Sequence, residues 1–112
     1  MKIAIASDNK MVASHFGHCE AFECFVLKDN KIDKWVRIEN PGHKPGFLPV
    51  YLYQKEVDVI IAGGMGQSAA DLFNRNGIKV VCGAKGNIED VANEYINGTL
   101  NAKGSLCEEH DH

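Results

Sequence analysis

The 112-residue sequence lacks the compositional signs of several protein classes. It has no block of basic residues and carries a net charge of -3, whereas a nucleic-acid partner normally requires a Lys/Arg face that neutralises phosphates. No run approaches the ~20 apolar residues of a membrane span. We therefore expect no nucleic-acid partner and no membrane segment.

Signals for secretion and for disulfide frameworks are also missing. The apolar start at residues 1–6 is interrupted by Ser7 and Asp8, so it is too short for the core of a secretion signal. We expect a soluble, cytoplasmic protein, in which cysteines usually remain thiols or ligands. The four cysteines include no CxxC pair, which disfavours a zinc ribbon or a thioredoxin-like dithiol.

Common catalytic motifs are absent as well. The sequence contains no GxSxG, HExxH or GxxxxGKS/T pattern. Asp8, Asp58, Asp71 and Asp90 fall on different predicted elements, so they form no evident two-metal carboxylate set. These absences disfavour a metal-dependent nuclease or phosphotransferase, and we predict that the protein is not an enzyme.

The apolar pattern that is present predicts one α/β domain over residues 1–100. Strands are predicted at residues 2–6, 21–27, 31–38, 57–62 and 78–82, and helices at residues 47–55, 67–76 and 88–97. The second and third strands form a hairpin, in which a period of two places Ile32, Val36 and Ile38 on one face. The later strands alternate with helices, which is typical of parallel pairing.

This order of elements predicts a five-stranded mixed sheet with helices on both faces. The expected strand order is 3-2-1-4-5, with strand 2 antiparallel. Strands 1 and 4 are then neighbours whose connections leave to opposite sides, and ligands bind beyond the carboxyl ends of strands at such a point. The loops after strands 1, 4 and 5 are therefore expected to form the binding site.

The loop after strand 1 holds three potential metal ligands within five residues: His15, His18 and Cys19. Imidazole and thiolate suit zinc, copper(I) or iron–sulfur species, and oxygen ligands for magnesium or calcium are lacking nearby. We favour a ligand role for His15 because of its place in this loop. For His18 and Cys19 the question stays open, since spacing does not show that side chains converge, and Cys19 equally suits a small buried position.

Glycines mark the loops after strands 4 and 5, at residues 63–66 and 83–86. Such loops let backbone N–H groups converge at helix N-termini, where partial positive charge favours an anion. A phosphate, a carboxylate or an anionic metal–sulfide cluster would suit this arrangement. The simpler alternative is that the chain only turns tightly there.

The C-terminal segment, residues 101–112, is polar and is predicted to be a flexible tail. It carries Cys107, His110 and His112 with acidic residues between them. A tail of this kind can fold over a metal or close a site. The alternative is a solvated acidic terminus whose histidines bind nothing.

Five segments occur in a diagnostic order. They are Ile3-Ala4-Ile5-Ala6-Ser7-Asp8, His15-Phe16-Gly17, Glu39-Asn40-Pro41, Asp58-Val59-Ile60-Ile61-Ala62-Gly63-Gly64-Met65-Gly66 and Gly77-Ile78-Lys79-Val80. Together they resemble the dinitrogenase iron-molybdenum cofactor biosynthesis family. The resemblance implies a ribonuclease H-like fold, binding of iron-molybdenum cofactor or its iron–sulfur precursor with His15 as a ligand, and partners among cofactor-assembly or acceptor proteins.

The leading hypothesis is a non-catalytic carrier of an anionic iron–sulfur or molybdenum–iron–sulfur cluster. The predicted cofactor-binding residues are His15, Phe16, Gly17, Gly63, Gly64, Met65 and Gly66. The predicted metal ligands are His15, His18, Cys19, Cys107, His110 and His112. The alternative is a module of the same fold that binds a small-molecule anion or a protein partner, in which the histidine loop only shapes a pocket.

Overall fold

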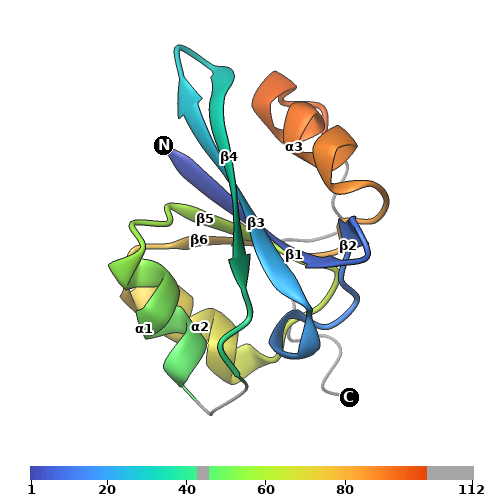
Figure 1. Ribbon diagram of the computed structural model, residues 1–112. Coiled ribbons are helices and arrows are strands. Elements are labelled where there is room, and N and C mark those ends of the chain that lie inside the picture. Colours follow the sequence, from blue (N-terminus) through green and yellow to red (C-terminus); the bar gives the residue numbers. More distant parts are fainter. Residues whose placement is uncertain (43–45, 101–112) are drawn as a thin grey trace.

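A computed structural model describes residues 1–42 and 46–100 (Figure 1). The strands are β1 (Lys2–Asp8), β2 (Met11–Val12), β3 (Ala21–Lys28), β4 (Lys31–Glu39), β5 (Val59–Ile61) and β6 (Lys79–Val81). The helices are α1 (Phe47–Gln54), α2 (Gln67–Arg75) and α3 (Ile88–Asn97), with a short 3-10 turn η1 (Phe16–His18). The predicted mixed α/β class is confirmed.

The sheet has the order β4-β3-β1-β5-β6. β3 runs antiparallel to both β1 and β4, whereas β5 runs parallel to β1 and β6. β2 pairs with the end of β1 as a short additional strand, with Ser7 opposite Val12. The sequence did not predict β2, because two residues are too few to show a period.

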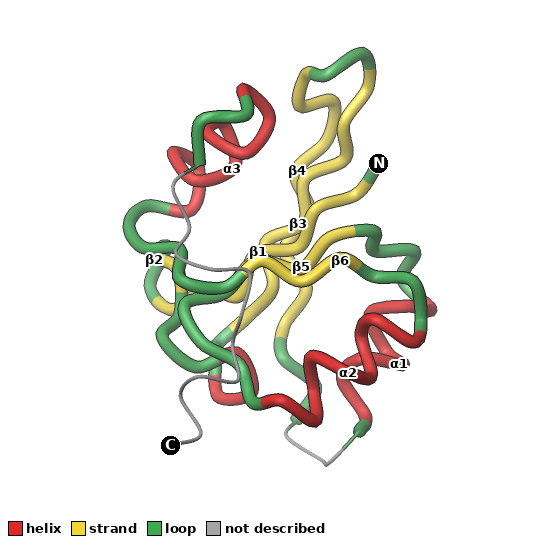
Figure 2. Tube along the Cα trace, turned by 180° about the vertical axis from the view of Figure 1, so that it is seen from behind, coloured by secondary structure: helices red, strands yellow, loops and turns green. Residues whose placement is uncertain are grey.

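The helices cover both faces of the sheet, α1 and α2 on one and α3 on the other (Figures 1 and 2). Alternation along β1 explains the two layers, since successive side chains point to opposite faces. Ala4 and Ala6 belong to the first core cluster, which lies under α1 and α2. Ile3 and Ile5 belong to the second core cluster, which lies under α3. One central strand therefore contributes to both cores.

The β3–β4 hairpin corrects one prediction, because Ile32 does not share the face of Val36 and Ile38. The register shifts within the hairpin, so that Val26 lies opposite Lys34 while Leu27 lies opposite Ile32. The intervening residue, Asp33, is the extra residue of a β-bulge. Ile32 consequently packs against the second core cluster and Ile38 against the first. A period of two cannot reveal an inserted residue.

The helices are eight to ten residues long, and among the described residues none has the length and apolar character needed to cross a bilayer. α3 is capped by the preceding Asn87, whose side chain accepts hydrogen bonds from the backbone N–H of Glu89 and Asp90. The residue at the same position before α2 is Gly66, which has no side chain to cap the helix. The two helices that start at the same edge of the sheet therefore differ at their first turns.

Candidate functional site

Three loops meet beyond the carboxyl ends of β1, β5 and β6. The backbone N–H of Gly63 donates to the carbonyl of Ala13 at 2.9 Å, and that of Phe16 donates to the carbonyl of Gly64 at 3.1 Å. The N–H of Gly83 in turn donates to the carbonyl of Gly63 at 3.0 Å. The structure thus joins the loops that the sequence had marked, and it joins them through backbone groups.

The glycines at 63 and 64 permit this contact between loops. A Cβ at Gly63 would lie 2.8 Å from the carbonyl oxygen of Ala13, and one at Gly64 would lie 2.9 Å from that of Ser14. Neither glycine has a positive φ, so neither is required for a left-handed turn. Their role is to let two backbones approach closely. The sequence analysis interpreted these glycines as part of an anion site or as tight turns, and neither interpretation included this role.

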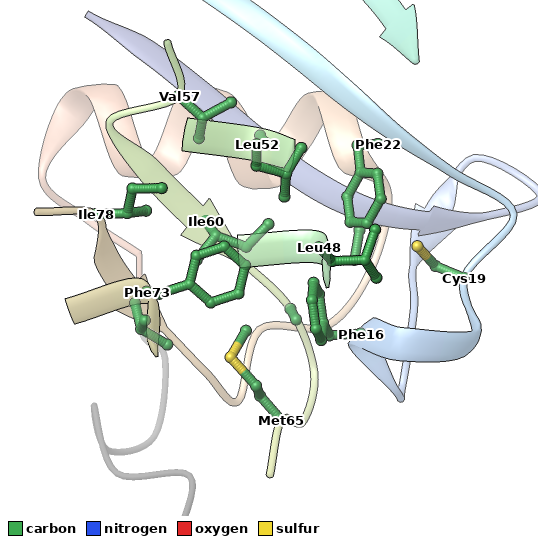
Figure 3. Close-up of a cluster of buried hydrophobic side chains, with 14 of the residues drawn as sticks. Phe16, Cys19, Phe22, Leu48, Leu52, Val57, Ile60, Met65, Phe73 and Ile78 are labelled. Carbon is green, nitrogen blue, oxygen red and sulfur yellow. The ribbon is translucent and has the colours of Figure 1, made fainter. Parts of the chain in front are cut away.

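Phe16 and Met65 belong to the first core cluster (Figure 3). The ring of Phe16 meets that of Phe73 edge-on, with centroids 5.2 Å apart, and lies 5.9 Å from that of Phe22. These two side chains therefore fix their loops to the core. Both residues were predicted to bind the cofactor, and a ligand at the site would meet their backbone groups.

The three predicted ligands of the first loop lie in different environments. His15 and His18 are exposed, whereas Cys19 is buried in the first core cluster near Phe22 (Figure 3). Burial raises the pKa of the Cys19 thiol to about 11, so the sulfur is protonated at neutral pH. Cys19 thus matches the small buried residue that was the alternative to a ligand. Cys24 is also buried.

The structure does not assemble a metal-ion site from these side chains. Across residues 1–42 and 46–100, no group of three or more His, Cys, Asp or Glu side chains is placed to hold a metal ion. The predicted tail ligands Cys107, His110 and His112 lie outside the described residues. What the described part of the site offers is therefore two exposed imidazoles, those of His15 and His18, and backbone groups.

Unused backbone donors line the loop before α2. The N–H of Gly63 is bonded to Ala13, and that of Ala70 is bonded to Gly66 within the start of the helix. Between them, the N–H groups of residues 64–68 donate to no other described residue. The first turn of α2 also contains no acidic side chain. Since free N–H groups at a helix start carry partial positive charge, this segment can accept an anion.

The sequence matches the family described as dinitrogenase iron-molybdenum cofactor over residues 1–98. The chain belongs to this family. The resemblance found in its sequence motifs is thereby confirmed, and two of those motifs, at residues 15–17 and 58–66, contain the loops that meet at the site.

Other proteins share the sequence or the fold of this member of the dinitrogenase iron-molybdenum cofactor family. The uncharacterized protein MJ0580 of Methanocaldococcus jannaschii is 30% identical over 105 residues, which cover 89% of each chain. The crystal structure of PH0822 superimposes with a TM-score of 0.87 at 28% identity, covering 92% of this chain and 95% of that one. The apo form of the orange protein from Desulfovibrio gigas gives 0.76 at 17% identity, covering 92% of both chains, which shows a common fold.

Asn40, to which the sequence analysis gave no role, holds the histidine loop of this family member in place. Its side-chain amide donates to the carbonyls of Cys19 at 2.8 Å and Gly17 at 3.3 Å, and its carbonyl oxygen accepts from the N–H of Gly42 at 3.0 Å. Its partners Gly17 and Cys19 lie 23 and 21 positions earlier in the chain. The residues around Asn40-Pro41 predict only a turn. They do not indicate that the Asn40 side chain bonds to Gly17 and Cys19.

Replacing Asn40 by alanine is expected to lower the free energy of unfolding by about 1–2 kcal/mol, because two partly buried carbonyls lose their donor. Asn74 provides a matched control, since its side chain is exposed on α2. Asn74→Ala is expected to change stability by less than about 0.5 kcal/mol. Urea unfolding of both variants measures the difference, and equal stabilities would contradict this role for Asn40.

Proposed function

We propose that the protein is a non-catalytic carrier of an iron–sulfur or molybdenum–iron–sulfur cluster in metal-cofactor assembly. One observation carries this proposal. The exposed His15 precedes Phe16, whose N–H donates to the carbonyl of Gly64, and Gly64 is the first of the residues 64–68 whose N–H groups are unused. Imidazole is a suitable ligand for such a cluster, and backbone N–H groups can donate to its anionic sulfides. Membership of a family named for the iron-molybdenum cofactor supports the same cargo.

A cluster fits the described residues better than a bare metal ion. A structural metal ion needs three or four protein ligands, and the described residues offer no such group. A preformed cluster arrives with its own sulfide ligands, so one imidazole and several hydrogen bonds can hold it. The same modest set of contacts would allow the cargo to be released to an acceptor protein.

Several finer features belong to this proposal. We place the carrier in the cytoplasm, with cofactor-assembly or acceptor proteins as its partners, and assign its fold to the ribonuclease H-like class. His18 is a second exposed imidazole in the same loop. Cys107, His110 and His112 remain proposed additional ligands. Cys19 is better explained by its core position than by ligation.

Anaerobic reconstitution of the full chain with iron and sulfide, with and without molybdate, tests the proposal. Uptake is measured by visible absorption and metal analysis. We expect His15→Ala to lose most of the uptake. Ser68→Asp should also lower uptake, because a carboxylate in the first turn of α2 occupies the free N–H groups and repels an anion.

Two controls separate loss of binding from loss of folding. Ser68 is exposed, so Ser68→Asp should leave the free energy of unfolding unchanged or slightly raised. Ser68→Asn has a similar shape without the charge and should reduce uptake much less. Equal and negligible uptake by the wild type and all variants would contradict the carrier proposal.

The alternative function is binding of a small anion without a cluster. The unused N–H groups of residues 64–68 favour it, since such groups also accept phosphate or carboxylate. Protein that takes up no cluster but binds a phosphate-bearing compound, with affinity reduced by Ser68→Asp, would support this alternative.

A further inference from the structure

Among residues 1–42 and 46–100, β4 leaves one long edge of the sheet open. Its inner edge pairs with β3 from Lys31 to Glu39, whereas no described residue pairs with its outer edge. Figures 1 and 2 show that the β3–β4 hairpin projects beyond the rest of the sheet. An edge of this length presents backbone N–H and C=O groups to which another strand can bind.

Two neighbouring apolar side chains lie exposed at the middle of this edge strand. Trp35 is 46% exposed and Val36 is 48% exposed. They lie on opposite faces: the ring of Trp35 is 4.8 Å from that of Phe25 in the second core cluster, and Val36 is opposite Cys24 of the first core cluster. The indole N–H of Trp35 donates to Glu23 at 2.8 Å, which fixes the ring in place.

We propose that β4 pairs antiparallel with β4 of a second copy of this chain, around a two-fold axis at Trp35. Each Lys34 then lies opposite Val36 of the other copy, and each Asp33 lies opposite Arg37 of the other copy. The sheet becomes continuous through the dimer. Because β3 separates β4 from β1, the loops of the candidate site remain free in both copies.

The charges along β4 favour this register over those with the two-fold axis at an adjacent residue. An axis at Asp33, Lys34 or Arg37 would place that residue opposite the same residue of the second copy, which carries the same charge. An axis at Val36 would place Asp33 opposite Glu39. Like charges directly opposite each other destabilise a strand pair, and opposite charges stabilise it. The axis at Trp35 avoids every like-charge pair across residues 33–37.

The same strand limits how strong this association can be. The β-bulge at Asp33 ends the regular part of the strand, so pairing in the proposed register is regular only from about Lys34 to Val36, with Asp33 and Arg37 at its margins. An interface this small belongs to the weak, reversible class of protein contacts. Lysine on an exposed edge commonly prevents pairing, and in the proposed register Lys34 faces Val36 and not another lysine.

Sedimentation velocity of the full chain at increasing concentration tests the proposal, with a matched pair of substitutions at Val36. We expect a reversible monomer–dimer equilibrium for the wild type. Val36→Lys should raise the dissociation constant about 5- to 10-fold, because it creates two lysine–lysine pairs. Val36→Glu should leave the dimer as strong or strengthen it, because it creates two lysine–glutamate pairs. Lys34→Glu combined with Val36→Lys should restore association.

The outcomes separate the proposal from its competitors. A wild-type chain that stays monomeric up to millimolar concentration overturns it. Equal weakening by Val36→Lys and Val36→Glu overturns the register, because that result is expected when Val36 faces its own copy. A dimer that neither substitution affects uses another surface and also overturns it. Because position 36 is exposed, urea unfolding should show that both variants remain folded.

Discussion

Phe73→Ala is expected to lower the free energy of unfolding by about 3–5 kcal/mol. Phe73 projects from α2 into the first core cluster, where it is fully buried and meets Phe16 edge-on at 5.2 Å. The substitution leaves a cavity beneath the histidine loop. That loop cannot readily collapse into the cavity, because backbone hydrogen bonds tie Ala13 to Gly63 and Phe16 to Gly64. A loss of this size approaches the whole stability of many small domains.

Urea unfolding followed by fluorescence of Trp35, the only tryptophan in the chain, measures this loss. Tyr53→Ala is the matched control, because this aromatic side chain lies 54% exposed on α1. The control is expected to change stability by less than about 0.5 kcal/mol. A loss below about 1 kcal/mol for Phe73→Ala would contradict its role as the support of Phe16.

Gly63→Ala is expected to lower the free energy of unfolding by about 2–3 kcal/mol. The new methyl group would lie 2.8 Å from the carbonyl oxygen of Ala13 and 3.0 Å from the Cα of Ser14. Both are backbone atoms, so no flexible side chain can move aside. The loops after β1 and β5 would have to separate, which weakens the hydrogen bond from Gly63 to Ala13.

Gly66→Ala is the matched control for this substitution. A Cβ at Gly66 meets no atom within 4 Å, and the backbone there has a φ of -69°, which alanine adopts without strain. We expect Gly66→Ala to change stability by less than about 0.5 kcal/mol. Similar stabilities for the two alanine variants would show that the loops do not pack as closely as the structure indicates.

The sequence by itself determined the α/β class, the alternation of strands and helices after residue 57 and the loops that form the candidate site. These features follow from local causes: buried parallel strands form short apolar runs, and glycine-bearing loops separate them from amphipathic helices. The position of His15 in the loop after the first strand was predicted for the same reason, whereas its exposure became known only from the structure. The ordered motifs were sufficient to indicate the family.

Only the tertiary structure decided which side chains of this region are exposed and which face the core. His15 and Cys19 are four positions apart, yet one is exposed and the other buried. The packing role of Gly63, the partners of Asn40 and the face occupied by Ile32 also depend on atoms that come from distant parts of the chain or on an inserted residue. Periodicity describes a residue relative to its neighbours in sequence. It cannot describe contacts that form only when separate elements are packed together.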